Sequence, residues 1–218
     1  MENSIQQAAT KWDYFQIINH GIPIEVLEDL KEAAHDFFEF PAEEKVVLYQ
    51  VLEYQKWAKP LAKKLLEVLL KSLNVNDIDE SLDPLLMGTM NVNMNYYPPC
   101  PNPNITIGAR RPCDGSYITL LFQDDTGGLY VRGTKGYNWI HVIPIKGALA
   151  VNIGDLLQII SNDRYKSIEH CVAVDSSRAR ISVPLFVNAS LDSVIGPFPQ
   201  MLKDVEKPVY KHVLHSDY

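Results

Sequence analysis

Four residues in the C-terminal two-thirds of the sequence have side chains suited to chemistry: Asp114, His170, Arg180 and Ser182. Carboxylates and imidazoles are common metal ligands, and a guanidinium binds a carboxylate bidentately because its N–H groups form a planar fork. Arg180 and Ser182 are two residues apart, so on a strand they face the same side. Taken singly, each residue has an ordinary explanation. Asp114 precedes a glycine, and this pair is common in hairpin turns. A single histidine such as His170 is more often a core residue than a ligand, and Arg180 can form an ion pair on the surface.

The region that must support these residues begins with a strand and a helix. Residues 14–18, YFQII, are aromatic and β-branched and predict a short buried strand. His20 follows in a turn and is expected to cap the passage from strand to helix. Pro23 is typical of a first helical turn, and apolar residues then recur at helical spacing, so we expect a helix that ends at Phe40-Pro41.

A second helix is predicted by leucines that repeat every four residues from Leu61 to Leu73, and Asn74 or Asn76 is expected to end it. After about residue 88 the sequence changes to short β-like runs separated by turn residues. The runs are residues 92–97, 117–122, 128–131, 139–142, 148–152, 168–174 and 181–186. Many short strands at this spacing are typical of a β-sandwich or barrel.

Composition sets the outer limits. The chain has 218 residues, 46% hydrophobic and 22% charged, which is typical of one globular domain. The net charge of −7 argues against broad binding to nucleic acid or anionic membranes. Three cysteines are too few and too irregular for a disulfide framework or a structural zinc site. No apolar run approaches the roughly 18 residues that span a bilayer. We therefore expect a cytoplasmic protein without nucleic-acid or membrane partners.

Several motifs, in the same order along the chain, resemble the plant Fe(II)- and 2-oxoglutarate-dependent dioxygenases. They are WDYFQIINHGIP, NMNYYPPCPNPN, GSYITLLFQDDTGGLYVR, NWIHVIPIKGALAVNIGDLLQIISNDRYKSIEH and RARISVPLFVN. The phrases NMNYYPPCPNP, SVIGPFP and VLHSDY are most similar to the feruloyl-CoA 6'-hydroxylase-like members. The resemblance implies an α+β, mainly β protein. A double-stranded β-helix (jelly-roll) core would occupy residues 89–218, with an N-terminal helical region, residues 1–88, packed on it.

The resemblance also implies a set of ligands. Iron(II) would be the metal, 2-oxoglutarate the co-substrate, ascorbate the reductant, and dioxygen the oxidant of a small aromatic or phenylpropanoid-like substrate. We expect the protein to be a monomer. In this family the iron is held by two histidines and one carboxylate, which leaves positions open for 2-oxoglutarate and dioxygen.

Individual positions match as follows. Asp114 corresponds to the aspartate of the family's metal motif, and His170 corresponds to the distal histidine, at a separation typical of the family. Arg180 and Ser182 match the pair that binds the far carboxylate of 2-oxoglutarate. Two further residues, Tyr97 and Asn95, match positions that hydrogen-bond the co-substrate.

One metal position departs from the family. The first histidine should stand two residues before Asp114, where this sequence has Pro112. The proline side chain has no ligand atom, and Cys113 would face the opposite side of a strand. Loss of outer-sphere partners alone lowers metal affinity about 10–100-fold, so loss of a ligand should weaken iron binding more strongly.

The chain is also shorter than the family usually is. The stretch between EEKVVLYQ and LAKKLLEVLL is reduced, and we expect the N-terminal strand and helix and the C-terminal lid helix to be absent or reduced. Two functions follow. One is a dioxygenase that hydroxylates a small aromatic metabolite. The other is a catalytically impaired or inactive truncated dioxygenase-like protein that folds and binds 2-oxoglutarate or a partner.

Overall fold

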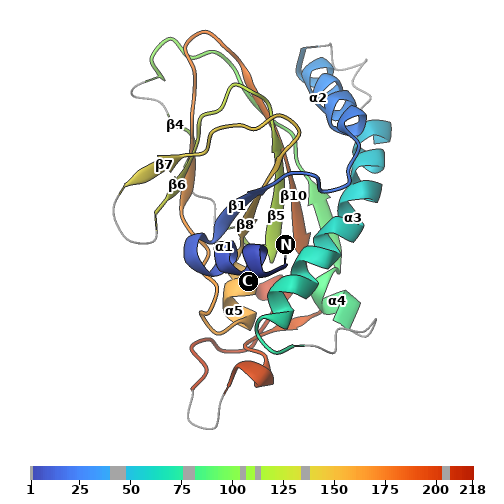
Figure 1. Cartoon of the computed structure of the whole chain (residues 1–218), viewed down its shortest axis with the longest axis vertical. Coiled ribbons are helices and arrows are strands. Elements are labelled where there is room, and N and C mark those ends of the chain that lie inside the picture. The colour runs from blue at the N-terminus through green and yellow to red at the C-terminus, as the bar shows by residue number, and fades with distance from the viewer. Residues whose placement is uncertain are drawn as a thin grey trace.

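The structure is a computed structural model of the whole chain. It describes residues 2–39, 48–75, 82–103, 107–110, 114–133, 138–202 and 207–218. Figure 1 shows strands at the centre of the molecule, with long helices along one side and a smaller group of strands on the other. This arrangement confirms a mainly β core with helices packed on it.

The described part of the chain has five α-helices, of which the sequence predicts two. They are α1 (Glu2–Trp12), α2 (Ile24–Glu39), α3 (Leu48–Lys71), α4 (Asp83–Leu86) and α5 (Asp155–Ile160), with short 3-10 turns at Pro199–Met201 and His215–Asp217. α2 starts directly after Pro23, as expected, and its predicted end at Phe40-Pro41 lies outside the described residues. α3 passes through Pro60 instead of starting after it. Pro60 has no N–H, so one backbone hydrogen bond of the helix is missing. The helix tolerates this loss because its residues on both sides of the proline are buried, namely Tyr54, Ala58 and Leu65.

The strands form two larger antiparallel sheets and one small one. The large sheet has the order β1-β8-β5-β10-β2, and β3 also pairs with β10. The smaller sheet has the order β4-β9-β6-β7, and β11 pairs with β12 near the C-terminus. In chain order the strands are β1 (Tyr14–Ile17), β2 (Thr89–Val92), β3 (Asn95–Tyr97), β4 (Ile107–Arg110), β5 (Ile118–Gln123), β6 (Leu129–Arg132), β7 (Trp139–His141), β8 (Leu149–Ile153), β9 (His170–Ala173), β10 (Arg180–Asn188), β11 (Val194–Ile195) and β12 (Val213–Leu214).

The predicted run 92–97 is two strands rather than one. β2 and β3 both pair with β10, and between them the N–H of Asn93 donates to the carbonyl oxygen of Pro184. Pro184 has no N–H and so cannot donate a second hydrogen bond to this segment. β4, β11 and β12 were not predicted.

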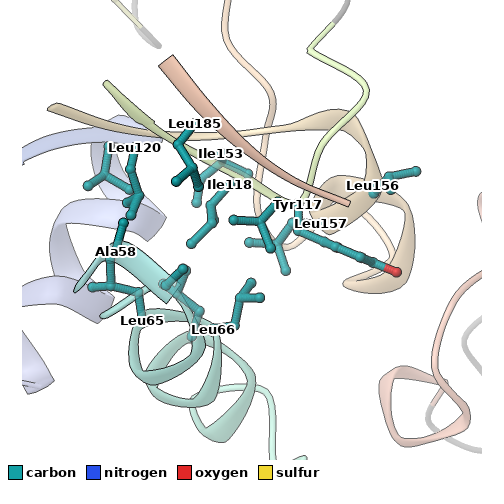
Figure 2. Close-up of a cluster of buried hydrophobic side chains, with 14 of the residues drawn as sticks. Ala58, Leu65, Leu66, Tyr117, Ile118, Leu120, Ile153, Leu156, Leu157 and Leu185 are labelled. Carbon is teal, nitrogen blue, oxygen red and sulfur yellow. The ribbon is translucent and has the colours of Figure 1, made fainter. Parts of the chain in front are cut away.

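The two faces of the large sheet have different environments. Figure 2 shows Ile118, Leu120 and Leu185 facing the side chains of Leu65 and Leu66 from α3. Residues that alternate with these, such as Thr119 and Asn152, face the opposite side. There a smaller apolar group lies between the sheets, and we call it the inter-sheet cluster: Leu129, Val131, Val142 and Val172, with Tyr14, Tyr97, Leu121 and Ile168 packed against it. The candidate site lies on this inner side.

The turn between β1 and α2 is held by His20, as the sequence predicts. The N–H of Ile22 donates to His20 Nδ1, and Nε2 lies 2.8 Å from the carbonyl oxygen of Gly147. His20 is therefore a structural residue. In the part of the chain that the structure describes, no helix is long and apolar enough to cross a membrane.

Candidate active site

The predicted co-substrate residues meet where β3 pairs with β10. Arg180 is the Cα partner of Tyr97, and Ser182 is the Cα partner of Asn95. The Arg180 side chain is only 1% exposed, and its guanidinium carbon lies 5.2 Å from the centre of the Tyr97 ring. Arg180 Nη1 donates to Ser182 Oγ at 2.8 Å. The spacing of two residues therefore places both side chains on one face, as expected.

Two further partners of the guanidinium were not predicted from the sequence. Arg180 Nη2 donates to Gln123 Oε1 at 3.0 Å, and Nε donates to the carbonyl oxygen of Gly127 at 2.6 Å. Gln123 is the Cα partner of Ser182 in β5, so only knowledge of the strand register could have identified it. Gly127 belongs to a glycine pair in the turn that leads into β6, and its backbone carbonyl orients the arginine.

Gly128 explains why this turn needs glycine. Its φ is +84°, and a Cβ built there would lie 2.4 Å from the carbonyl oxygen of Ala173 in β9. A side chain would therefore push the turn away from β9 and move the Gly127 carbonyl oxygen that orients Arg180.

The charge of Arg180 is buried without an ion-pair partner among the described residues. Among the described residues, its hydrogen-bond acceptors are neutral and no carboxylate forms an ion pair with it. Burial lowers the pKa of Arg180, whereas Tyr97, the buried Asp124 and Tyr14 act to raise it. A buried cation without a partner is costly, by several kcal/mol in real proteins. The donor set therefore fits a carboxylate ligand, such as one end of 2-oxoglutarate.

Asp114 lies just before β5, is 6% exposed, and is held from several sides. Its Oδ1 accepts hydrogen bonds from the Ser116 N–H at 3.3 Å and from Ser116 Oγ at 2.5 Å. Its Oδ2 accepts hydrogen bonds from Thr119 Oγ1 at 2.8 Å and from Asn152 Nδ2. Thr119 and Asn152 are Cα partners across β5 and β8, so the sheet itself fixes the carboxylate on its inner face.

His170 begins β9 in the smaller sheet and is half-buried, and its side chain forms no hydrogen bond with the described residues. Its neighbour Cys171 is the Cα partner of Arg110 in β4, and Asp114 follows Arg110 by four residues. The Cα partner of His170 in β6 is Val131, a member of the inter-sheet cluster, so the imidazole lies on the inner face of the smaller sheet. The binding of iron by Asp114 and His170 stays a prediction.

The fit to iron is incomplete. Among the described residues, no group of three or more histidine, cysteine, aspartate or glutamate side chains could hold a metal ion. Pro112 and Cys113, which occupy the rest of the metal motif in the sequence, lie outside the described residues.

Two family models match this chain. The model for the 2OG-Fe(II) oxygenase superfamily matches residues 88–189, and the model for the N-terminal region of non-haem dioxygenases in morphine synthesis matches residues 2–96.

Curated relatives match nearly the whole chain. A bi-functional coumaroyl CoA and feruloyl CoA ortho-hydroxylase from Ipomoea batatas is 46% identical over 263 positions, covering 98% of this chain and 74% of the relative. A feruloyl CoA ortho-hydroxylase from Arabidopsis thaliana is 40% identical, covering 99% of this chain and 73% of the relative. The alignment with the Ipomoea batatas relative spans 263 positions, whereas this chain has 218 residues. At least 45 residues of the relative therefore have no counterpart in this chain.

Solved structures share the fold. JOX2, crystallised with 2OG, Fe and JA, has a TM-score of 0.88 and 26% sequence identity, covering 99% of this chain and 79% of that chain. The rice dioxygenase for auxin oxidation has a TM-score of 0.87 and 18% identity, covering 100% and 87%. The double-stranded β-helix expected from the sequence is thereby confirmed. Sequence and fold agree that this chain belongs to the 2OG-Fe(II) oxygenase superfamily.

Proposed function

We propose that this chain binds 2-oxoglutarate between its two sheets and serves as a hydroxylase of phenylpropanoid CoA esters. The observation that carries the first half is the buried Arg180 guanidinium, which has neutral acceptors on three sides and no carboxylate partner among the described residues. Arg180 and Ser182 would bind the far carboxylate. Tyr97 and Asn95, on the adjacent strand, would contact the rest of the co-substrate. The substrate class is taken from the relatives that are named for coumaroyl CoA and feruloyl CoA.

The residues of this chain have distinct tasks in the proposal. Arg180 orients 2-oxoglutarate because its own fork is fixed by Gln123 and Gly127. The inter-sheet cluster keeps water away from the bound molecule, which strengthens each charged hydrogen bond. Asp114 and His170 would hold Fe(II), which supplies the oxygen-activating chemistry of this family when bound. Ascorbate as reductant, a monomeric state and a cytoplasmic location complete the proposal and rest on the sequence alone.

A second candidate function is a dioxygenase-like protein that binds 2-oxoglutarate but turns over poorly. Two observations favour it. Pro112 replaces a metal histidine, and both oxygens of Asp114 already accept hydrogen bonds from protein groups. A carboxylate that is so fully engaged has less freedom to turn toward an ion that has lost one of its imidazoles.

The co-substrate proposal is tested by calorimetric titration of 2-oxoglutarate into the whole chain, with Arg180→Gln as the test variant and Arg178→Gln as the control. Arg178 is exposed and pairs with Asp125 on the surface. We expect Arg180→Gln to weaken binding at least about tenfold, because one charged hydrogen bond contributes about 1.5–3 kcal/mol. The control should bind like the wild type. Equal loss in both variants, or in neither, contradicts the site.

The choice between the two functions is tested with Pro112→His. Fe(II) titration and iron-dependent formation of succinate from 2-oxoglutarate are measured with and without feruloyl CoA. If the chain is impaired, Pro112→His should bind iron more tightly than the wild type and turn over faster. The gain in affinity should exceed the factor of about 10–100 that outer-sphere partners contribute. Equal turnover in wild type and variant contradicts impairment and supports the active enzyme. If neither protein binds iron, the assignment of Asp114 and His170 as ligands is wrong.

A further inference from the structure

Tyr14 lies on the inner face of the large sheet, between the two parts of the candidate site. It is the Cα partner of Asn152 across β1 and β8, so the two side chains are neighbours on one face. Asn152 donates to the Asp114 carboxylate. On the other side, Tyr14 and Tyr97 pack against the same inter-sheet cluster, and the Tyr97 ring lies beside Arg180.

The Tyr14 hydroxyl is buried and has no hydrogen-bond partner. Across the described residues, only two other buried side-chain groups share this property, the hydroxyls of Tyr54 and Tyr117. Both of these belong to the main hydrophobic core, which includes the outer face of the sheet. An unsatisfied buried hydroxyl costs about 1–3 kcal/mol, so each one calls for an explanation.

Only for Tyr14 does the surrounding charge supply an explanation. Burial raises the pKa of the Tyr14 hydroxyl, and the positive charge of Arg180 opposes that rise. For Tyr54 and Tyr117, burial is the sole cause of a raised pKa. The Tyr14 hydroxyl is therefore a neutral donor that lies in the field of the arginine, where an anion would be attracted.

There is also space beside this residue. A cavity of about 440 Å³ lies between β1 and the smaller sheet, and its lining includes Tyr14, Phe15, Val131, His141 and Val142. Val131 and Val142 belong to the inter-sheet cluster. Tyr14 therefore lines this cavity, although Arg180 and Ser182 do not, and its buried hydroxyl lies in the field of Arg180.

We propose that Tyr14 is a further binding residue for 2-oxoglutarate and that its hydroxyl donates a hydrogen bond to the carboxylate held by Arg180. The proposal rests on the proposed function, since it assigns a partner to the same ligand. A phenol is suited to this position because it gives a proton to a carboxylate oxygen and adds no second charge near the guanidinium. The ligand supplies the acceptor that the folded chain lacks at this hydroxyl.

The test compares Tyr14→Phe with the matched control Tyr54→Phe in the whole chain. Each change removes one buried, unpartnered hydroxyl and keeps the ring. Without ligand, both variants should melt at or above the wild-type temperature, because an unsatisfied group has been removed. With 2-oxoglutarate, Tyr14→Phe should bind at least about tenfold more weakly by calorimetry and show a smaller ligand-induced rise in melting temperature. Tyr54→Phe should bind like the wild type.

Other results separate the two proposals. If the wild type and Tyr14→Phe bind 2-oxoglutarate equally while Arg180→Gln does not bind, the role of Tyr14 is overturned and the co-substrate site stands. If the wild type does not bind 2-oxoglutarate at all, the proposed function fails first. If Tyr14→Phe changes only the affinity for feruloyl CoA, the hydroxyl serves the aromatic substrate, and the assignment to 2-oxoglutarate is wrong.

Discussion

Asp13, which directly precedes Tyr14, should make the stability of this protein fall as the pH rises from about 4 to 6. Its side chain is 2% exposed, and its Oδ1 accepts a hydrogen bond from the Lys166 N–H at 3.0 Å. Burial is the main cause that raises the pKa of Asp13 from 3.8 to about 6, and Lys166 opposes it. The folded state therefore favours the protonated carboxyl.

The direction and the size of the change in the free energy of unfolding follow from this pKa shift. Below pH 3.8 Asp13 is protonated in both states, and its favourable contribution to folding is fully present. As the pH rises through about 6, that contribution is lost, because the unfolded chain ionises first. The full shift corresponds to about 3 kcal/mol, of which about 2 kcal/mol falls between pH 4.5 and 7.5.

The variant Asp13→Asn isolates the effect. Asparagine stays neutral at every pH, keeps the acceptor for Lys166, and tolerates the positive φ of 54° at this position. Urea unfolding followed by tryptophan fluorescence should show the variant gaining about 2 kcal/mol over the wild type between pH 4.5 and 7.5. The exposed Asp192→Asn removes the same charge and should show no such change. A difference between Asp13→Asn and wild type that is the same at both pH values would refute the reasoning.

Three other substitutions test the packing around the site. Leu66→Ala, in the core between α3 and the large sheet, should lower the free energy of unfolding by about 2–5 kcal/mol in urea, and a loss below about 1 kcal/mol would contradict its burial. Gly128→Ala should cost about 2 kcal/mol or more and also weaken 2-oxoglutarate binding, because the new Cβ meets the Ala173 carbonyl oxygen. Normal binding would show that the turn does not orient Arg180. Asn152→Ala should cost about 1–3 kcal/mol through the lost donor to Asp114, and an unchanged unfolding curve would argue against that hydrogen bond.

The sequence predicts most strands of this fold because their patterns are local. The β1 strand over residues 14–17 and the helix after Pro23 both follow from short apolar patterns bounded by turn residues. The start of α3 was wrong, because the leucine repeat predicted a helix only from Leu61, whereas α3 begins at Leu48 and contains Pro60. Packing of the flanking apolar residues on the sheet outweighs that local rule, and such packing is not visible in a single segment.

In the site, too, local sequence patterns could be predicted and contacts that depend on strand pairing could not. Arg180 and Ser182 were predicted from their match to the family motif, and their spacing of two places them on one face of a strand whatever the register. Gln123, Asn152 and Tyr14 were missed because they reach the site only through the pairing of β5, β8 and β1. The sequence contained one usable signal for Tyr14, since it lies in the motif WDYFQIINHGIP, but the burial of its hydroxyl depends on the smaller sheet that covers it.

The central claim is that Arg180 binds a carboxylate of 2-oxoglutarate between the two sheets. A crystal structure of this chain with 2-oxoglutarate tests it most directly. The account predicts the molecule on the inner face of the large sheet, with one carboxylate within hydrogen-bonding distance of Arg180 and Ser182 and the Tyr14 hydroxyl at the same carboxylate. A structure in which 2-oxoglutarate lies elsewhere, for example in the cavity of about 510 Å³ lined by Ile5, Phe15 and Leu65 beside α1 and α3, would contradict it.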